Sequence, residues 1–123
     1  FYYCDPDGFT EYVRSKEALP VDGRTPEIKN LTFRDIEAVN CHVAAAYLYG
    51  LPEKKIGRVE MENIHVSYAE NPKKDIPAML EGIEPMARQG IIAKNITELI
   101  IRNVRIDGPE GAPVSTEGVD RMI

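Results

Sequence analysis

The most regular hydrophobic pattern in this chain is a nine-residue phrase that occurs three times, over residues 28–36, 56–64 and 96–104. In each copy two apolar positions lie two residues apart, as Leu31 and Phe33 do, which is the spacing of a half-buried strand. The following apolar position comes three residues later, on the wrong face of a straight strand. A repeat of this kind predicts a stack of similar β units.

Each copy carries Asp or Asn immediately before the out-of-step apolar residue, at Asp35, Asn63 and Asn103. These residue types tolerate a left-handed backbone better than other non-glycine residues. We therefore expect the strand to bend there and a second short strand to follow. If equivalent strands pair in parallel, the three corner side chains stack as a ladder.

The spacing of the copies favours a right-handed parallel β-helix. Ile28 and Ile56 are 28 residues apart (56 − 28), and Ile56 and Ile96 are 40 apart (96 − 56), which leaves room for one turn plus a loop of variable length. Leucine-rich repeats are the main alternative, although they show a tighter period. A β-sandwich whose strands resemble one another by coincidence is the plainer alternative.

Two further segments fit a coiled architecture. Residues 43–49, which contain three consecutive alanines, are predicted to form the third strand of the first complete coil around a narrow interior. Residues 69–90 contain several Pro and Gly residues and form the longest irregular excursion. Within it, residues 76–80 are expected to form a brief helix or strand that covers the stack, and contact with substrate is the alternative role.

Composition indicates one domain over residues 1–123, with 43% hydrophobic and 28% charged residues. No apolar stretch is long enough to span a bilayer. The formal net charge of −5 gives no support for nucleic-acid binding. The basic pairs at 54–55 and 73–74 are interpreted as solvated loop charges.

Potential metal and redox residues are few. Cys4 and Cys41 either pair as one disulfide in a secreted protein or remain two thiols between strands. His42 and His65 are interpreted as structural or surface residues, and no metal site or cofactor is predicted. Residues 1–8 form an aromatic run followed by a turn sequence, and we expect them to end a coil whose earlier part lies upstream.

Taken in order, several short motifs resemble the C-terminal part of bacterial glycoside hydrolase family 28, the polygalacturonase-like enzymes. These motifs are Phe-Tyr-Tyr-Cys-Asp-Pro-Asp-Gly at 1–8, Thr-Pro-Glu-Ile-Lys-Asn-Leu-Thr-Phe-Arg-Asp-Ile at 25–36, Ala-Ala at 45–46, Gly-Leu-Pro-Glu at 50–53 and Glu-Asn-Ile at 62–64. The resemblance implies the C-terminal coils of a β-helix that hydrolyses α-linked galacturonate chains with inversion.

Such hydrolysis needs one carboxylic acid on the leaving oxygen and carboxylate help for the attacking water. The family's catalytic motifs, Asn-Thr-Asp, Asp-Asp, Gly-His-Gly and Arg-Ile-Lys, do not occur in this sequence. The nearest string, residues 105–107, is interpreted as a strand end, and Asp22, Asp75 and Glu84 as loop charges. No catalytic residue is therefore assigned, and this segment alone is expected to be inactive.

The family places a tyrosine near the sugar at the cleavage site, and the resemblance makes Tyr2 or Tyr3 its counterpart in substrate binding. Aromatic packing along the stack is the alternative role for these two residues.

Two functions remain open at this stage. The first is a segment of a pectin-degrading hydrolase, whose partner is the polysaccharide substrate. The second is a noncatalytic β-helical module for carbohydrate binding or assembly. Exposed coil edges also predict self-association. The mode of cleavage, the particular pectic substrate and the localisation (secreted, periplasmic or cytoplasmic) are left undetermined.

Overall fold

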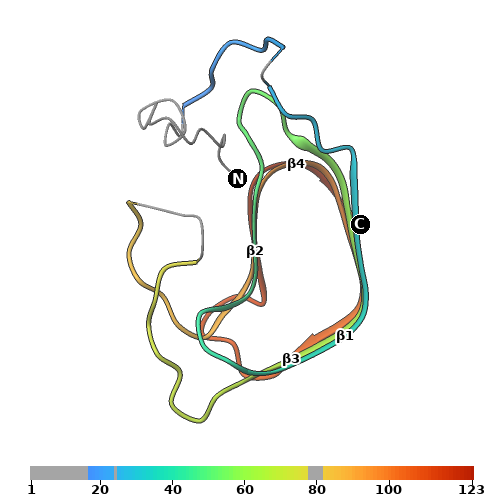
Figure 1. The fold of residues 1–123 in the computed structure, drawn as a ribbon. Coiled ribbons are helices and arrows are strands. Elements are labelled where there is room, and N and C mark those ends of the chain that lie inside the picture. Colours follow the sequence, from blue (N-terminus) through green and yellow to red (C-terminus); the bar gives the residue numbers. More distant parts are fainter. Residues whose placement is uncertain (1–16, 24, 78–81) are drawn as a thin grey trace.

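The computed structural model describes residues 17–23, 25–77 and 82–123, which form five parallel strands and no helix. The strands are β1 (Asn30–Cys41), β2 (Ala44–Tyr49), β3 (Ile56–Tyr68), β4 (Gln89–Ile106) and β5 (Val114–Met122). They make one sheet in the order β1-β3-β4-β2, with β5 also pairing with β4. Figure 1 shows this sheet curling around an interior. The predicted all-β, parallel architecture is confirmed at this level, and it is consistent with the start of a β-solenoid.

The three repeats pair with one another in phase. Leu31 is in register with Val59, and Val59 with Leu99. The same alignment holds for the next apolar positions of each repeat, which are Phe33, Met61 and Ile101. Equivalent positions of the three sequence repeats therefore lie beside one another on paired strands.

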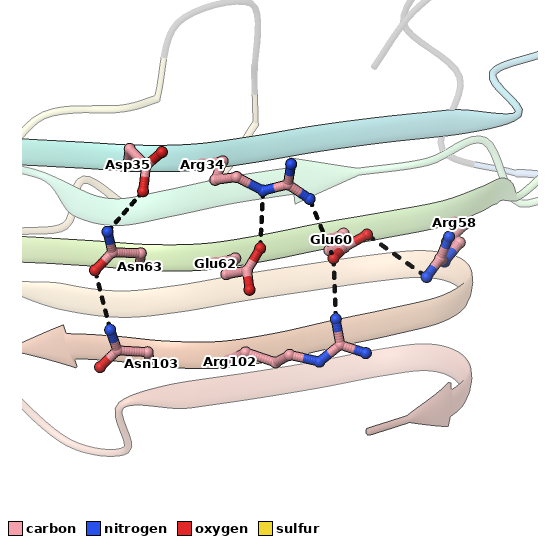
Figure 2. A network of polar contacts seen from close by, with 8 residues as sticks. All are labelled: Arg34, Asp35, Arg58, Glu60, Glu62, Asn63, Arg102 and Asn103. Atoms are coloured by element: carbon pink, nitrogen blue, oxygen red, sulfur yellow. Dashed lines mark hydrogen bonds and ion pairs between the residues drawn. The ribbon is translucent and has the colours of Figure 1, made fainter.

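The corners predicted before the out-of-step apolar residues are confirmed. Asp35, Asn63 and Asn103 have φ angles of 57°, 53° and 48°. The Asn63 amide donates to Asp35 Oδ1 at 2.6 Å, and the Asn103 amide donates to Asn63 Oδ1 at 3.0 Å. Figure 2 shows this ladder crossing three strands. The bend keeps the apolar positions on both sides of the corner directed into the same interior.

Replacing the middle residue of the ladder separates backbone strain from lost hydrogen bonds. Asn63→Ala removes both amide contacts and leaves a Cβ at positive φ, so we expect a loss of about 2 kcal/mol in the free energy of unfolding. Asn63→Gly loses the same contacts without the strain and should cost about 1 kcal/mol. Urea unfolding followed by circular dichroism tests this. Equal losses in the two variants would contradict the role assigned to the left-handed corner.

The core lies at the middle levels of the stack, where strands pair on both edges. Val59, Ile96 and Leu99 are fully buried. Ile36 was expected on the inner face with Ile64, but it is 40% exposed whereas Ile64 is 5% exposed. The reason is position, because among the described residues β1 pairs only with β3 and its outer edge has no strand beside it.

One side of the interior, which we call the third wall, is formed by β2 and the first parts of β4 and β5. Of these three segments, only β2 was predicted from the sequence. The strand predicted at residues 43–49 is β2, which begins one residue later, at Ala44. It pairs with the first part of β4, which in turn pairs with β5, and neither of these two segments was predicted. The sequence of β5 is largely polar, and its pattern is broken at Gly118, where φ is 64°.

The predicted long excursion is the connection between β3 and β4, over residues 69–88. Its base is attached to the turn after β1, since the Lys73 N–H donates to His42 Nδ1 and the Arg88 N–H donates to the His42 carbonyl. Most of the predicted covering segment, at residues 78–80, lies outside the described residues. Ile76 and Pro77 have no regular structure.

Candidate functional site

The residues predicted to bind substrate, Tyr2 and Tyr3, lie outside the described residues, as does Cys4. Cys41 is a half-buried free thiol. Within residues 17–23, 25–77 and 82–123, no group of three or more His, Cys, Asp or Glu side chains is arranged to hold a metal ion. A candidate site must therefore be sought among the outward side chains of the described strands.

The string at residues 105–107 ends a strand, as predicted, because β4 ends at Ile106. Asp107 follows it and lies 2.7 Å from His65 Nε2, while Arg105 contacts Asp107 Oδ1 at 3.1 Å. The hydrogen bond from His65, together with the nearby Arg105, holds the pKa of Asp107 below its ordinary value. The corner ladder, His65 and Arg105 line a shallow groove of about 410 Å³. It is a structural cluster to which we assign no ligand.

The lowered pKa of Asp107 makes a testable contribution to stability. A carboxyl whose pKa is depressed by folding stabilises the fold above its unfolded pKa, and this contribution is lost as pH falls through the folded pKa. The stability difference between the wild type and Asp107→Asn should therefore shrink as pH falls from about 5 to 2.5. Urea titrations at several pH values measure it, with exposed Glu110→Gln as the control. A difference that stays constant with pH would contradict the ion contacts.

The pairs interpreted as solvated loop charges differ: Lys73 and Lys74 are exposed, as expected, whereas Lys54 and Lys55 are half-buried. Asp22, Asp75 and Glu84 are exposed and lie outside the five strands, as expected for loop charges. Lys54 pairs with Glu27 at 3.7 Å, and Lys55 pairs with Asp120 at 2.6 Å. Lys54, Lys55 and Glu27 line a second shallow groove, of about 370 Å³, to which we assign no ligand.

The outer side of the third wall carries an aromatic surface. Tyr47 and Tyr49 point outward from β2. They pair with Ile92 and Lys94 on β4, which alternate with the buried, inward-facing Ile91 and Ala93. The two tyrosine rings are nearly parallel, with centroids 6.4 Å apart and planes 5° apart. Five outward residues form a surface that we call the tyrosine–lysine face: Tyr47, Tyr49, Ile92, Lys94 and Glu117.

A cation lies over one of these rings. Lys94 Nζ is 5.8 Å from the centroid of Tyr49 and 3.3 Å from Glu117 Oε2. Partial burial opposes the charged form of Lys94, but the nearby tyrosines and the Glu117 carboxylate outweigh it and raise the pKa of Lys94 above its ordinary value. The ammonium therefore stays charged at neutral pH. The face combines flat apolar rings with a permanent positive charge and a hydrogen-bonding carboxylate.

Sequence reasoning did not identify this face, although one signal was available. Alternation along residues 44–49 places Tyr47 and Tyr49 on one side of a strand. Their combination with Lys94 depends on the pairing of β2 with β4, which joins Tyr49 to a residue 45 positions later (94 − 49). That pairing is set by the stacking of the coils.

A second outward surface, which we call the charged face, lies beside the corner ladder. Seven side chains from β1, β3, β4 and β5 are joined by ion pairs on it: Arg34, Arg58, Glu60, Glu62, Glu98, Arg102 and Arg121. Figure 2 shows Glu60 at its centre, contacted by three arginines. Four arginines against three glutamates leave this surface with a net charge of +1 (4 − 3).

Two general findings concern membrane-spanning helices and similarity to known proteins. In the part of the chain that the structure describes, no helix is long and apolar enough to cross a membrane. No protein-family model, curated protein or solved structure matches the sequence or the fold.

Proposed function

We propose that this chain forms coils of a right-handed parallel β-helix in a polygalacturonase-like glycoside hydrolase, and that its tyrosine–lysine face binds the acidic polysaccharide. The observation that carries the functional part is the pairing of Tyr47 and Tyr49 with charged Lys94 on one surface. Aromatic rings pack against the apolar faces of sugar rings, and an ammonium binds a uronate carboxylate.

The fold part of the proposal rests on the in-phase pairing of the repeats and on a general rule of handedness. The connections from β1 to β3 and from β3 to β4 join parallel strands of one sheet. Such crossovers are right-handed in about 98% of cases. The stacked corner residues add a feature that any further coil of the same kind would extend.

Hydrolysis is not assigned to residues of this chain, because its sequence lacks the family's paired catalytic acids. The described segment would contribute to binding, while the acids that protonate the leaving group and activate water would come from other coils. The alternative is a noncatalytic carbohydrate-binding or assembly module, for which the same face would bind sugar and no hydrolysis would occur.

The first experiment reads the coding DNA in frame upstream of Phe1. Asn-Thr-Asp, Asp-Asp, Gly-His-Gly and Arg-Ile-Lys on preceding coils would support the hydrolase. A start codon next to Phe1 would instead support the binding or assembly module.

Binding is tested directly by calorimetric titration of the full chain with oligogalacturonate. We expect Tyr47→Ala and Lys94→Gln each to weaken binding about tenfold, which corresponds to the loss of about 1.4 kcal/mol. Tyr47→Phe keeps the ring and should bind as the wild type does, and Lys74→Gln removes an exposed charge elsewhere. Equal binding by all variants would overturn the assignment of this face.

A further inference from the structure

On the charged face, the negative side chains are more deeply buried than the positive ones, which is unlike an ordinary network of exposed ion pairs. The side chains of Glu60 and Glu98 are only 11% and 27% exposed, whereas those of Arg34 and Arg121 are 52% and 69% exposed. The carboxylates therefore lie against the sheet and the guanidinium groups lie above them. Solvent meets a layer of positive charge, although the whole chain carries a net charge of −5.

The guanidinium groups retain hydrogen-bonding capacity to different degrees: Arg34 and Arg58 each use Nε and Nη2 on two carboxylates, whereas Arg102 and Arg121 each use one nitrogen. A guanidinium carries five N–H donors in a planar fork. Arg102 contacts Glu60 through Nη1, and Arg121 contacts Glu98 through Nη1. These contacts place the forks of Arg102 and Arg121 over the sheet while occupying one nitrogen of each. The remaining donors suit a second carboxylate, which arginine binds in a bidentate manner.

The arginines are also regularly spaced across the strands. Arg34 on β1 and Arg102 on β4 lie on either side of β3, and Arg58 on β3 and Arg121 on β5 lie on either side of β4. Each pair is separated by two strand spacings, about 9.5 Å between strand axes. This repeat runs along the stack, so it matches a chain molecule with carboxylates at regular intervals better than it matches a single small anion.

We propose that the charged face is a second binding surface, which takes a carboxylate-bearing polysaccharide laid across strands β1, β3, β4 and β5. The choice of a sugar polymer rests on the proposed function, whereas the charge and the spacing come from the charged face itself. Nucleic acid fits less well, because duplex DNA carries one charge per about 1.7 Å of its axis, far denser than arginines spaced about 9.5 Å apart.

The probe is oligogalacturonate, with its fully methyl-esterified form as the uncharged counterpart. The full chain should bind the acidic form at low salt and lose affinity as salt rises, since the contact is an exposed charge pairing. Arg34→Gln combined with Arg102→Gln should weaken binding at least tenfold. Arg121→Gln should weaken it several-fold, and it touches a single carboxylate at 3.6 Å, which leaves the Glu60 network intact.

The matched control is Arg105→Gln, which removes one arginine that is 71% exposed and lies beyond the corner ladder. Binding by this variant should equal that of the wild type. A urea unfolding curve for each variant establishes that the fold is retained. If the double variant is unfolded, Arg121→Gln alone decides the result.

The outcomes separate this inference from the proposed function. Charged-face variants that bind as the wild type does, while Tyr47→Ala loses binding, overturn the inference and leave the proposed function in place. Loss in the charged-face variants with full binding by Tyr47→Ala and Lys94→Gln supports the inference and overturns the assignment of the tyrosine–lysine face. Equal affinity for the methyl ester, tighter binding of a DNA oligonucleotide or an equal loss in Arg105→Gln would also overturn it.

Discussion

Leu99→Ala is expected to lower the free energy of unfolding by about 2–5 kcal/mol, the range measured for truncating a buried leucine. Leu99 is fully buried on β4. Strands lie on both sides of it, because Leu99 pairs with Val59 on β3 and with Met122 on β5. Hydrogen-bonded strands above and below limit how far the backbone can move to fill the cavity, which places the expected loss in the upper part of that range.

Leu31→Ala is the matched control, because Leu31 occupies the same position in the first repeat. Its side chain is only partly buried, at the level where β1 has no described strand on its outer edge. We expect a loss about half as large, since solvent can reach the space that the truncation leaves. Urea unfolding of both variants measures the difference. Equal losses would mean that the outer level is packed as tightly as the middle one.

Gly50→Ala is expected to destabilise the fold by at least about 3 kcal/mol, at the upper end of the range for overpacking. A Cβ at Gly50 would lie 2.1 Å from the backbone oxygen of Asn95 and 3.1 Å from the backbone nitrogen of Ile56. The Gly50 N–H also donates to the Lys94 carbonyl, and the Asn95 amide donates to the Gly50 carbonyl. Relief of the clash would require the first coil to separate from β4.

Gly23→Ala is the control for this prediction, because a Cβ at Gly23 would meet no heavy atom of the described residues within 4 Å. We expect its stability to stay within about 0.5 kcal/mol of the wild type. If Gly50→Ala unfolds too readily for equilibrium measurement, the yield of folded protein and its circular dichroism spectrum give the comparison. Wild-type stability in Gly50→Ala would contradict the close approach of these two levels.

Much of the fold was predictable because its repeat is local and its corners have a chemical signature. The two-residue step of Leu31 and Phe33, followed by a three-residue step, indicated a bent strand, and Asp35 marked the bend. These features act over a few residues, where side-chain alternation and backbone preference decide the conformation.

The segments that sequence reasoning missed are those whose conformation depends on distant partners. β5 has few apolar residues, and it becomes a strand because the exposed edge of β4 pairs with it over Val114 to Met122. β-propensity is weak evidence for such a polar segment, since pairing and packing against neighbours dominate it. The first part of β4 was likewise not recognised as a strand, because it directly follows the long irregular excursion.

The sequence by itself determined the repeated strand, its left-handed corner and the in-phase pairing of the three repeats, because each depends on spacing and on the backbone preference of single residues. Only the tertiary structure decided which side chains share a surface. Tyr49 meets Lys94, and Arg34 meets Glu62, because parallel pairing brings residues that are distant in the sequence to matching positions on neighbouring strands. Loop lengths between coils vary without changing that register, so these neighbours have no fixed separation in the sequence.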